Sequence, residues 1–337
     1  MILTIAIPTY NRNETLKKSI VHLLPQITPD CQLVIQDNHS DTPVAESVNN
    51  ICKCYPGVSV KIVRHRWNLG ATANILRCLE VCETEWIWIL GDDDIVAAGA
   101  VDTVLKNVSN NDDSIYFSFL TQAHKDTGAR RLSYRSRGRS EFIQMLDCAH
   151  LLNFMSCSVW RAEPFRQHIS TGFDYAYSMG WTFALLLTTL RDSEVVVFSN
   201  EVLVLKSTIS PIVNRWSFRR FLLGWPTLLE INLSKTEGRI LGRKLLGRMI
   251  TPETIAAYLL VDQTKYACPD RFLTYDLVKG RIAPYKIHRL SWLRFAIYRL
   301  LFIKPELGWS IVRRAIQVAN RLGVKSIDLS DMEGRAA

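Results

Sequence analysis

Three consecutive aspartates, Asp92, Asp93 and Asp94, are the residues of this 337-residue chain whose type and spacing point most directly to chemistry. They follow Gly91 and the apolar run Trp86–Leu90, which is typical of a buried strand. Adjacent carboxylates repel one another, and a bound cation removes that repulsion. Oxygen ligands suit Mg²⁺ or Mn²⁺, which normally complete their coordination with phosphate oxygens and water. The triplet therefore predicts a metal site for a diphosphate, with a helix cap or solvated turn as the alternative.

Polar segments also follow three earlier strand-like runs. They are Pro8-Thr9-Tyr10-Asn11-Arg12, Asp37-Asn38-His39-Ser40-Asp41 and Asn68-Leu69-Gly70. Ligands of parallel sheets bind at the carboxyl ends of the strands, so we expect these segments and the triplet to share one site. Asp37 has two interpretations at this stage. It is a good turn or N-cap residue, and it is also a carboxylate that can accept hydrogen bonds from a base edge or a ribose hydroxyl.

The first 120 residues alternate between short β-rich runs and segments with helical periodicity, which predicts an α/β fold with a parallel, nucleotide-binding sheet and helices on both faces. Expected strands are Leu3–Ile7, Gln32–Gln36, Val58–Arg64, Trp86–Leu90 and Ser114–Leu120. Expected helices are Glu14–Leu24, Pro43–Lys53, Ala71–Cys82 and Ala98–Val108. These elements place the four polar segments in the turns that follow strands.

The alternation stops at a basic stretch, His124–Arg139, which we expect to be an exposed loop or hairpin. Further elements are expected as helices at Glu141–Leu152 and Trp181–Leu190, and as strands at Ser156–Trp160, Val195–Phe198 and Val202–Leu205. A soft boundary follows near Ser210–Asn214. Beyond it the sequence predicts a mainly helical region in which apolar and basic residues are mixed.

The formal net charge of +9 is concentrated late in the chain, since residues 215–314 hold 19 Lys and Arg against 7 Asp and Glu. Such a region suits an anionic partner, either a membrane surface or nucleic acid, unless it is simply a solvated basic face. No run of about 18 uncharged apolar residues predicts a membrane span. The start of the sequence lacks the features of a signal peptide. We therefore expect a cytoplasmic protein, with the eight cysteines as reduced core residues.

The four segments, in this order, resemble the signature of the family 2 glycosyltransferases, and the Ile-Leu-Gly-Asp-Asp-Asp form is similar to bacterial transferases of O-antigen or capsule sugars. The resemblance covers residues 1–120 closely and 121–205 more loosely. It implies a GT-A-type, Rossmann-like fold with a donor and nucleotide pocket and a metal held by Asp92, Asp93 and Asp94. The pocket residues that it implies are Pro8, Thr9, Tyr10, Arg12, Asp37 (to the base), Asn68, Gly70, Asn74, Asp92 and Asp93.

Two departures from the family pattern concern catalysis. Many members have an aspartate where this chain has Gly91, which leaves open which carboxylates of the triplet bind metal and which bind ribose. Inverting members often carry a Glu-Asp pair whose Asp is the general base. Here Asp174 is the nearest carboxylate and is our predicted base. The alternatives are His150, Glu163 and His168.

The resemblance implies an inverting transfer of a sugar from a nucleotide-sugar donor to a saccharide acceptor, linked to a polyprenyl diphosphate at the cytoplasmic face of the membrane. Residues 1–210 would form the transferase domain, with a donor half at 1–120 and an acceptor half at 121–210, while residues 211–337 would attach to the anionic membrane surface. Nucleic acid is not the expected partner, and the oligomeric state is left open. A sugar-phosphate nucleotidyltransferase and a non-catalytic nucleotide- or lipid-binding protein are the competing functions. Nicotinamide and P-loop enzymes are disfavoured because their glycine motifs are missing.

Overall fold

The computed structural model describes residues 1–111, 113–128, 130–147, 152–178, 180–207, 224–246, 296, 299–300 and 303–322. The chain divides into two compact units, Met1–Arg215 and Trp216–Ala337. The functional division that we placed at residue 210 stays a prediction.

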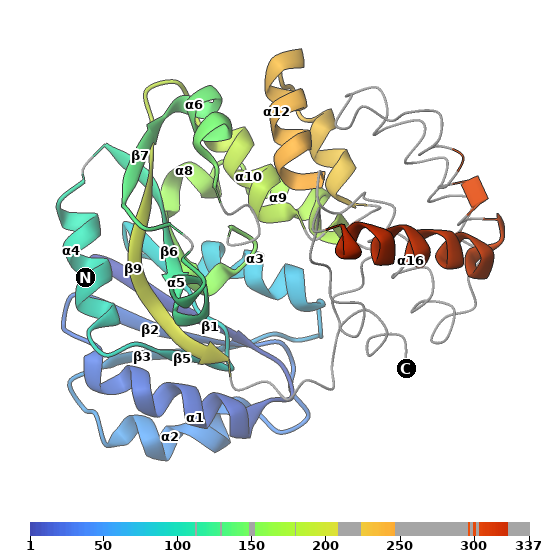
Figure 1. Ribbon diagram of the computed structural model, residues 1–337. Coiled ribbons are helices and arrows are strands. Elements are labelled where there is room, and N and C mark those ends of the chain that lie inside the picture. Colours follow the sequence, from blue (N-terminus) through green and yellow to red (C-terminus); the bar gives the residue numbers. More distant parts are fainter. Residues whose placement is uncertain are drawn as a thin grey trace. The chain divides into compact units, whose positions relative to one another are not determined.

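A nine-stranded mixed sheet forms the centre of the described part of the first unit (Figure 1). Its strands lie in the order β3-β2-β1-β4-β8-β6-β9-β5, and β7 pairs with β9. The strand bounds are β1 Leu3–Thr9, β2 Cys31–Asp37, β3 Ser59–Arg64, β4 Trp86–Ile89, β5 Asp94–Val96, β6 Ser114–Thr121, β7 Tyr134–Arg137, β8 Ser158–Arg161 and β9 Val195–Ser207. The first four strands are parallel to one another.

The register brings the carboxyl ends of the parallel strands to one level. Thr9 at the end of β1 pairs with Asp37 at the end of β2, and Asp37 pairs with Arg64 at the end of β3. On the other side of β1, Ala6 pairs with Ile89, the last residue of β4. The turns that follow these strands therefore lie along one edge of the sheet, where ligands of such sheets bind.

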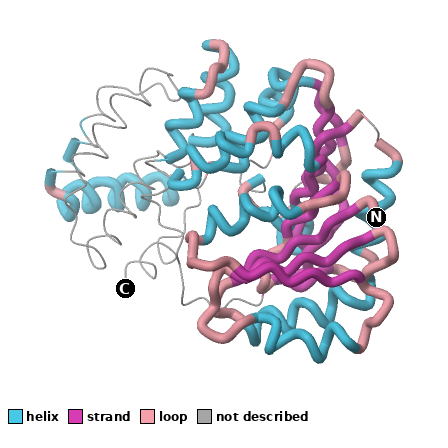
Figure 2. Tube along the Cα trace, turned by 180° about the vertical axis from the view of Figure 1, so that it is seen from behind, coloured by secondary structure: helices cyan, strands magenta, loops and turns pink. Residues whose placement is uncertain are grey.

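Helices cover both faces of the parallel strands (Figure 2), because the strands are buried on both sides and need apolar cover on each. On one face α1, α2 and α4 pack in the same core cluster as Ile5 and Leu33. On the other face α3 packs against β1 and is itself covered by α9. The helix bounds are α1 Asn13–Leu23, η1 Leu24–Gln26, α2 Val44–Lys53, α3 Ala71–Val81, α4 Ala100–Ser109, α5 Gln122–Asp126, α6 Gly138–Met145, η2 Met155–Cys157, α8 Ala162–Arg166, α9 Ile169–Asp174, η3 Ala176–Ser178 and α10 Trp181–Thr189.

The basic stretch 124–139 is not entirely the exposed loop or hairpin that we expected. Arg130 is buried, and its guanidinium donates to the carbonyl oxygens of Ser118 and Ser199 and pairs with Asp147 at 3.1 Å. The same group lies over the ring of Phe198, 5.1 Å from its centroid. One arginine of the stretch is thus a core residue, because hydrogen bonds and an ion pair compensate its buried charge.

Two further details differ from the expected elements. The strands expected at Val195–Phe198 and Val202–Leu205 are one long strand, β9, whose pairing with β6 contains register shifts. The cysteines that the structure describes are all free, but Cys54 is exposed and Cys52 only partly buried, so these two are not core residues.

In the second unit, every element among the described residues is helical: η4 Trp225–Glu230, α12 Lys235–Leu246 and α16 Pro305–Arg321. Most of the aromatic residues that lie among the arginines of this region are outside the described residues. They are Trp216, Phe218, Phe221, Trp292, Phe295, Tyr298 and Phe302. Among the helices that can be described, none combines the length and apolar character needed to span a membrane.

Candidate functional site

The aspartate triplet lies directly after β4, in a buried turn that leads into β5. Asp92, Asp93 and Asp94 are only 4%, 6% and 3% exposed. The turn is closed by a hydrogen bond from the Asp94 amide to the Gly91 carbonyl oxygen at 3.3 Å, and Asp94 is already the first residue of β5. Three buried carboxylates in sequence need compensating charge, so their partners define the site.

Arg12 is the main positive partner of the triplet. Its guanidinium bridges two carboxylates, donating to Asp92 Oδ1 at 2.7 Å and to Asp93 Oδ2 at 2.8 Å. The hydroxyl of Thr9 donates to the second oxygen of Asp92 at 2.7 Å, and Ser19 donates to the Asp92 carbonyl oxygen at 2.9 Å. Burial raises the pKa of Asp92 to about 6, although the charge of Arg12 and the hydrogen bond from Thr9 lower it. The structure thus joins the turn after β1 to the triplet, as predicted.

Asp94 has a different environment, built around Ser156 of η2. The Ser156 hydroxyl donates to Asp94 Oδ2 at 2.5 Å and accepts the Gly91 amide at 2.8 Å. Burial, together with the negative charges of Asp93 and Asp92, raises the pKa of Asp94 to about 7, although the hydrogen bond from Ser156 lowers it. The other oxygen of Asp94 is buried without a hydrogen-bond partner.

Gly91 lies in close contact with two of the carboxylates. A Cβ at this position would lie 2.6 Å from Asp94 Oδ2 and 3.0 Å from Asp93 Oδ1, so an oxygen of each carboxylate lies beside the Gly91 backbone. Within the part of the chain that the structure describes, no three His, Cys, Asp or Glu side chains gather as a metal cluster. The donor set therefore fits a divalent ion held by one or two carboxylates and completed by phosphate oxygens, rather than an all-protein cage.

Asp37 lies at the end of β2 and is 1% exposed. Its carboxylate accepts hydrogen bonds from the amides of Ser40 and Val44 at 2.8 and 3.3 Å and pairs with Arg64 at 2.7 Å. Burial alone would raise the pKa of Asp37, but these hydrogen bonds and the charge of Arg64 lower it. In this structure Asp37 therefore orders the loop between β2 and α2.

The remaining predicted donor residues lie along the same edge of the sheet. Asn74 is buried in α3, and its amide nitrogen contacts the Thr9 and Gln36 carbonyl oxygens at 3.5 and 3.3 Å. Asn68 accepts a hydrogen bond from the amide of Gly70, which has a φ of +81° and precedes α3. Pro8 is buried within β1, and Tyr10 is half-buried in the turn after it.

The predicted catalytic base, Asp174, lies at the C-terminal end of α9 and is exposed. Within the described residues, no hydrogen bond or ion pair joins it to the triplet. Of the alternatives, Glu163 forms an ion pair with Arg166. It follows Arg161, the β8 residue that pairs with Trp86 at the start of β4, so it lies toward the end of β4 opposite the triplet. His168 immediately precedes α9 and His150 lies outside the described residues.

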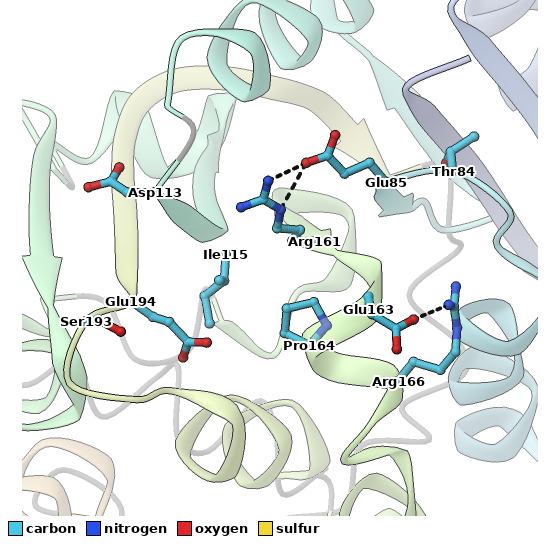
Figure 3. Close-up of a pocket in the computed structure, with 10 residues that line it drawn as sticks. All are labelled: Thr84, Glu85, Asp113, Ile115, Arg161, Glu163, Pro164, Arg166, Ser193 and Glu194. Carbon is cyan, nitrogen blue, oxygen red and sulfur yellow. Dashed lines mark hydrogen bonds and ion pairs between the residues drawn. The ribbon is translucent and has the colours of Figure 1, made fainter.

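A pocket of about 500 Å³ (Figure 3) has none of the triplet residues in its lining. It lies at the amino ends of β4, β6 and β9 and is lined by Thr84, Glu85, Asp113, Ile115, Arg161, Glu163, Pro164, Arg166, Ser193 and Glu194. Its two arginines pair with its own carboxylates, Arg161 with Glu85 and Arg166 with Glu163. Of the residues predicted from the sequence, one alternative base, Glu163, lines this pocket, and it is already paired with Arg166.

Sequence reasoning missed two residues that contact predicted site residues. Ser156 bridges Gly91 and Asp94, and Arg64 binds Asp37. Arg64 could have been found, because it ends a predicted strand beside the one that leads to Asp37. Ser156 had no such signal, since it is 62 residues from Asp94 in the sequence.

Comparison with known proteins places this geometry in a family. Residues 4–169 match the model of Glycosyl transferase family 2. Abequosyltransferase RfbV of Salmonella typhimurium is 26% identical over 142 residues, which cover 42% of this chain and 41% of that protein. A GalNAc(5)-diNAcBac-PP-undecaprenol beta-1,3-glucosyltransferase of Campylobacter jejuni is 24% identical over 107 residues, or 32% of this chain and 34% of that protein. The chain thus aligns with less than half the length of either relative.

Solved structures share the fold at low sequence identity. S. aureus TarS 1-349 in complex with UDP-GlcNAc has a TM-score of 0.62 at 11% identity, covering 96% of this chain and 92% of that chain. The mannosyltransferase PcManGT from Pyrobaculum calidifontis, in complex with GDP-Man and Mn²⁺, has a TM-score of 0.55 at 12% identity, covering 92% and 86%. The predicted GT-A-type α/β fold is confirmed by this likeness. Residues 4–169, just under half of the chain, therefore match a family 2 glycosyltransferase domain.

Proposed function

We propose that the chain moves a sugar from a nucleotide-sugar donor to a saccharide acceptor by a metal-assisted, inverting displacement. The observation that carries this proposal is the buried triplet Asp92–Asp94 at the carboxyl end of β4, held by Arg12. The family 2 domain supports it, as do the nucleotide sugars in two similar structures, UDP-GlcNAc in TarS and GDP-Man in PcManGT.

Of the three predicted metal ligands, Asp93 and Asp94 fit best, since one oxygen of each lies beside Gly91 and the other oxygen of Asp94 has no hydrogen-bond partner. They would hold Mg²⁺ or Mn²⁺, the latter present in the PcManGT complex. A bound divalent ion neutralises the charge that develops on the diphosphate as the sugar–phosphate bond breaks. Both oxygens of Asp92 accept hydrogen bonds from Thr9 and Arg12, so Asp92 would mainly orient the guanidinium.

Arg12 adds a second positive group to the proposed donor site. Its side chain remains 36% exposed while it binds the two carboxylates. A guanidinium has five N–H donors, and the bonds to Asp92 and Asp93 leave others for a phosphate oxygen. The loops carrying Tyr10, Asn68 and Gly70 would complete the donor pocket, with Asn74 fixing the strand ends beneath them.

Asp174 remains our proposed general base, acting on the acceptor hydroxyl. Its helix, α9, packs closely on α3, where Gly172 meets the Leu76 side chain, and α3 begins next to Gly70. The test is Asp174→Asn with Asp192→Asn, another exposed aspartate, as the matched control. We expect Asp174→Asn to lower kcat at least tenfold with little change in donor KM, and the control to behave as wild type. Unchanged kcat would remove Asp174, leaving His168 as the next candidate.

We further propose a lipid-linked acceptor presented at a membrane surface. One relative is named for a PP-undecaprenol substrate. Residues 216–337 carry 21 Lys and Arg against 10 Asp and Glu. Along α16 and its C-cap, an exposed apolar stripe lies beside Arg314 and Arg321; it consists of Leu307, Ile311, Val318 and Leu322. Such a surface suits anionic lipid headgroups.

Liposome sedimentation tests this attachment. The full chain should sediment with anionic vesicles, less at high salt, and not with neutral ones. Ile311→Ser with Val318→Ser should weaken binding, whereas Leu205→Ser, on an exposed site of β9, should not. Equal recovery in the supernatant with anionic and neutral vesicles would exclude membrane attachment without affecting the donor proposal.

The transfer reaction itself is tested by incubating the protein with a panel of nucleotide sugars and MnCl₂. We expect release of the nucleoside diphosphate from one donor, its loss in excess chelator, and a product of inverted anomeric configuration by NMR. The nucleotidyltransferase alternative would instead release pyrophosphate from a sugar phosphate and a nucleoside triphosphate. A non-catalytic protein would release neither. Retention of full activity in chelator would contradict the metal role.

A further inference from the structure

An exposed tryptophan stands at the edge of the proposed donor site. Trp67 is 68% exposed, and its ring centroid lies 6.1 Å from that of His39, which is also exposed. Both residues lie outside the family signature, since His39 fills an unspecified position of the Asp37–Asp41 segment and Trp67 precedes Asn68. Single exposed aromatic residues are common on protein surfaces, and Trp67 differs from them in how its loop is held and in where it lies.

The two loops that carry these rings are joined by hydrogen bonds. Asn38 donates from its amide nitrogen to Asn68 Oδ1 at 2.8 Å and accepts the Leu69 amide at 2.9 Å. The Asp37 carbonyl oxygen accepts the His65 amide at 2.8 Å. His39 adopts a left-handed φ of +66°, which costs energy for a non-glycine residue. Trp67 therefore lies in a loop that hydrogen bonds hold in place. A ligand that stacks on its ring pays little entropy cost for ordering the backbone.

The position of Trp67 matches the reach of a nucleotide. The triplet follows β4 and Trp67 follows β3, and the sheet order β3-β2-β1-β4 separates these strands by three intervals. Neighbouring strands lie about 4.8 Å apart, so the two strand ends are about 14 Å apart. With the diphosphate at the triplet, a ribose extending along this edge carries its base toward β2 and β3.

The groups at that end of the site favour contact with the face of the base. The Asp37 carboxylate is buried and already accepts three hydrogen bonds, so an edge contact with a base would compete with the loop's own structure. The rings of Trp67 and His39 are exposed and need no rearrangement. Aromatic faces stack on any base, because every base has a π-face.

We propose that Trp67, with His39 beside it, stacks on the heterocyclic base of the donor's nucleoside diphosphate and is a principal determinant of donor affinity. The inference rests on the proposed nucleotide-sugar function and adds to it two residues that the signature does not contain.

The test is titration calorimetry of the full chain with UDP, GDP, CDP, ADP and dTDP in MnCl₂, and with pyrophosphate as a ligand that has no base. For the diphosphate that binds best, Trp67→Ala should weaken Kd about 5- to 100-fold. Trp67→Phe should remain within about threefold, because it keeps an aromatic face. Pyrophosphate affinity should not change in either variant. Leu132→Ala, which removes an equally exposed apolar side chain elsewhere, is the matched control.

Two results would overturn the inference, and they are distinguishable. If Trp67→Ala keeps its nucleoside-diphosphate affinity within twofold of wild type, the stacking role is wrong and the proposed function stands. If the wild-type protein binds none of the five nucleoside diphosphates, the proposed function fails together with the inference. Thermal unfolding of each variant checks that a loss of affinity does not come from unfolding. We expect little change in stability, because Trp67 is exposed.

Discussion

Replacing Asp94 with asparagine should stabilise the metal-free protein while abolishing sugar transfer. The Asp94 carboxyl group is buried, one of its oxygens has no partner, and two further aspartates precede it. Burial and these neighbouring charges raise its pKa to about 7, from 3.8 for a free aspartate. In the proposed mechanism the same carboxylate holds the metal. The substitution thus separates stability from function.

The expected gain follows from the two pKa values. Below about pH 4 the carboxyl group is protonated in both the folded and unfolded states, so wild type and variant have similar stability. As pH rises towards 7, the unfolded group ionises while the folded one keeps its proton, and the free energy of unfolding of wild type falls. Asparagine does not ionise, so the free energy of unfolding of the variant does not fall in this way. The variant should be more stable by about 2 kcal/mol at pH 5 and about 4 kcal/mol at pH 8.

Urea denaturation in chelator at pH 5 and pH 8 measures this difference, and Asp113→Asn is the control of opposite sign. Burial would raise the pKa of Asp113, but the hydrogen bond from Arg137 and the charge of Arg135 lower it below the usual value. Its contribution to stability is present above pH 4 and lost in acid, so its removal should destabilise the protein at pH 8. Equal stability of Asp94→Asn and wild type at pH 8, or a difference that does not grow with pH, would refute the reasoning.

Three further substitutions have defined outcomes. Gly91→Ala places a methyl group 2.6 Å from Asp94 Oδ2, so we expect a loss of about 1–3 kcal/mol in thermal unfolding and at least tenfold lower transfer. Ser156→Ala removes both the donor to Asp94 and the acceptor of the Gly91 amide, and should cost about 1–3 kcal/mol in urea denaturation. Arg130→Met removes the bonds that Arg130 makes to Asp147 and to the carbonyl oxygens of Ser118 and Ser199. It should cost about 3 kcal/mol, while nucleotide-sugar affinity, measured by calorimetry, is unchanged. Wild-type stability of any of these variants would contradict the close approach or the hydrogen bonds on which its prediction depends.

The parallel half of the fold was predictable because local signals there agree with the tertiary structure. The expected strand Leu3–Ile7 is β1, which extends to Thr9, and the expected helix Ala71–Cys82 is α3, which ends at Val81. In both cases an apolar run ends at polar residues that begin a turn, so the local pattern marks the boundary. The joining of the turns after β1 and β4 also followed from topology alone, because parallel strands end at one edge.

The second half of the domain was less predictable because its structure depends on distant partners. β5 is only three residues long and pairs with β9, more than a hundred positions later in the chain. β9 continues through Ser199 and Asn200, polar residues that lie between the two strands expected from the sequence. Arg130 can be buried because it forms an ion pair with Asp147 and lies over the ring of Phe198. No local sequence pattern indicates either contact. Such elements are decided by tertiary pairing rather than by local propensity.

The charges of the site explain why its geometry was only partly visible in the sequence. Three ionised aspartates and one arginine leave two negative charges in a buried turn, and the structure relieves this by raising the pKa values of Asp92 and Asp94. A divalent cation carries the charge that would balance the fully ionised turn. The sequence predicts the excess of carboxylates, but only the fold shows that Arg12 compensates Asp92 and Asp93 while Asp94 keeps an unpartnered oxygen. The negative charge of the turn is therefore least balanced without a cation. Metal and donor should bind together and stabilise the domain as they bind.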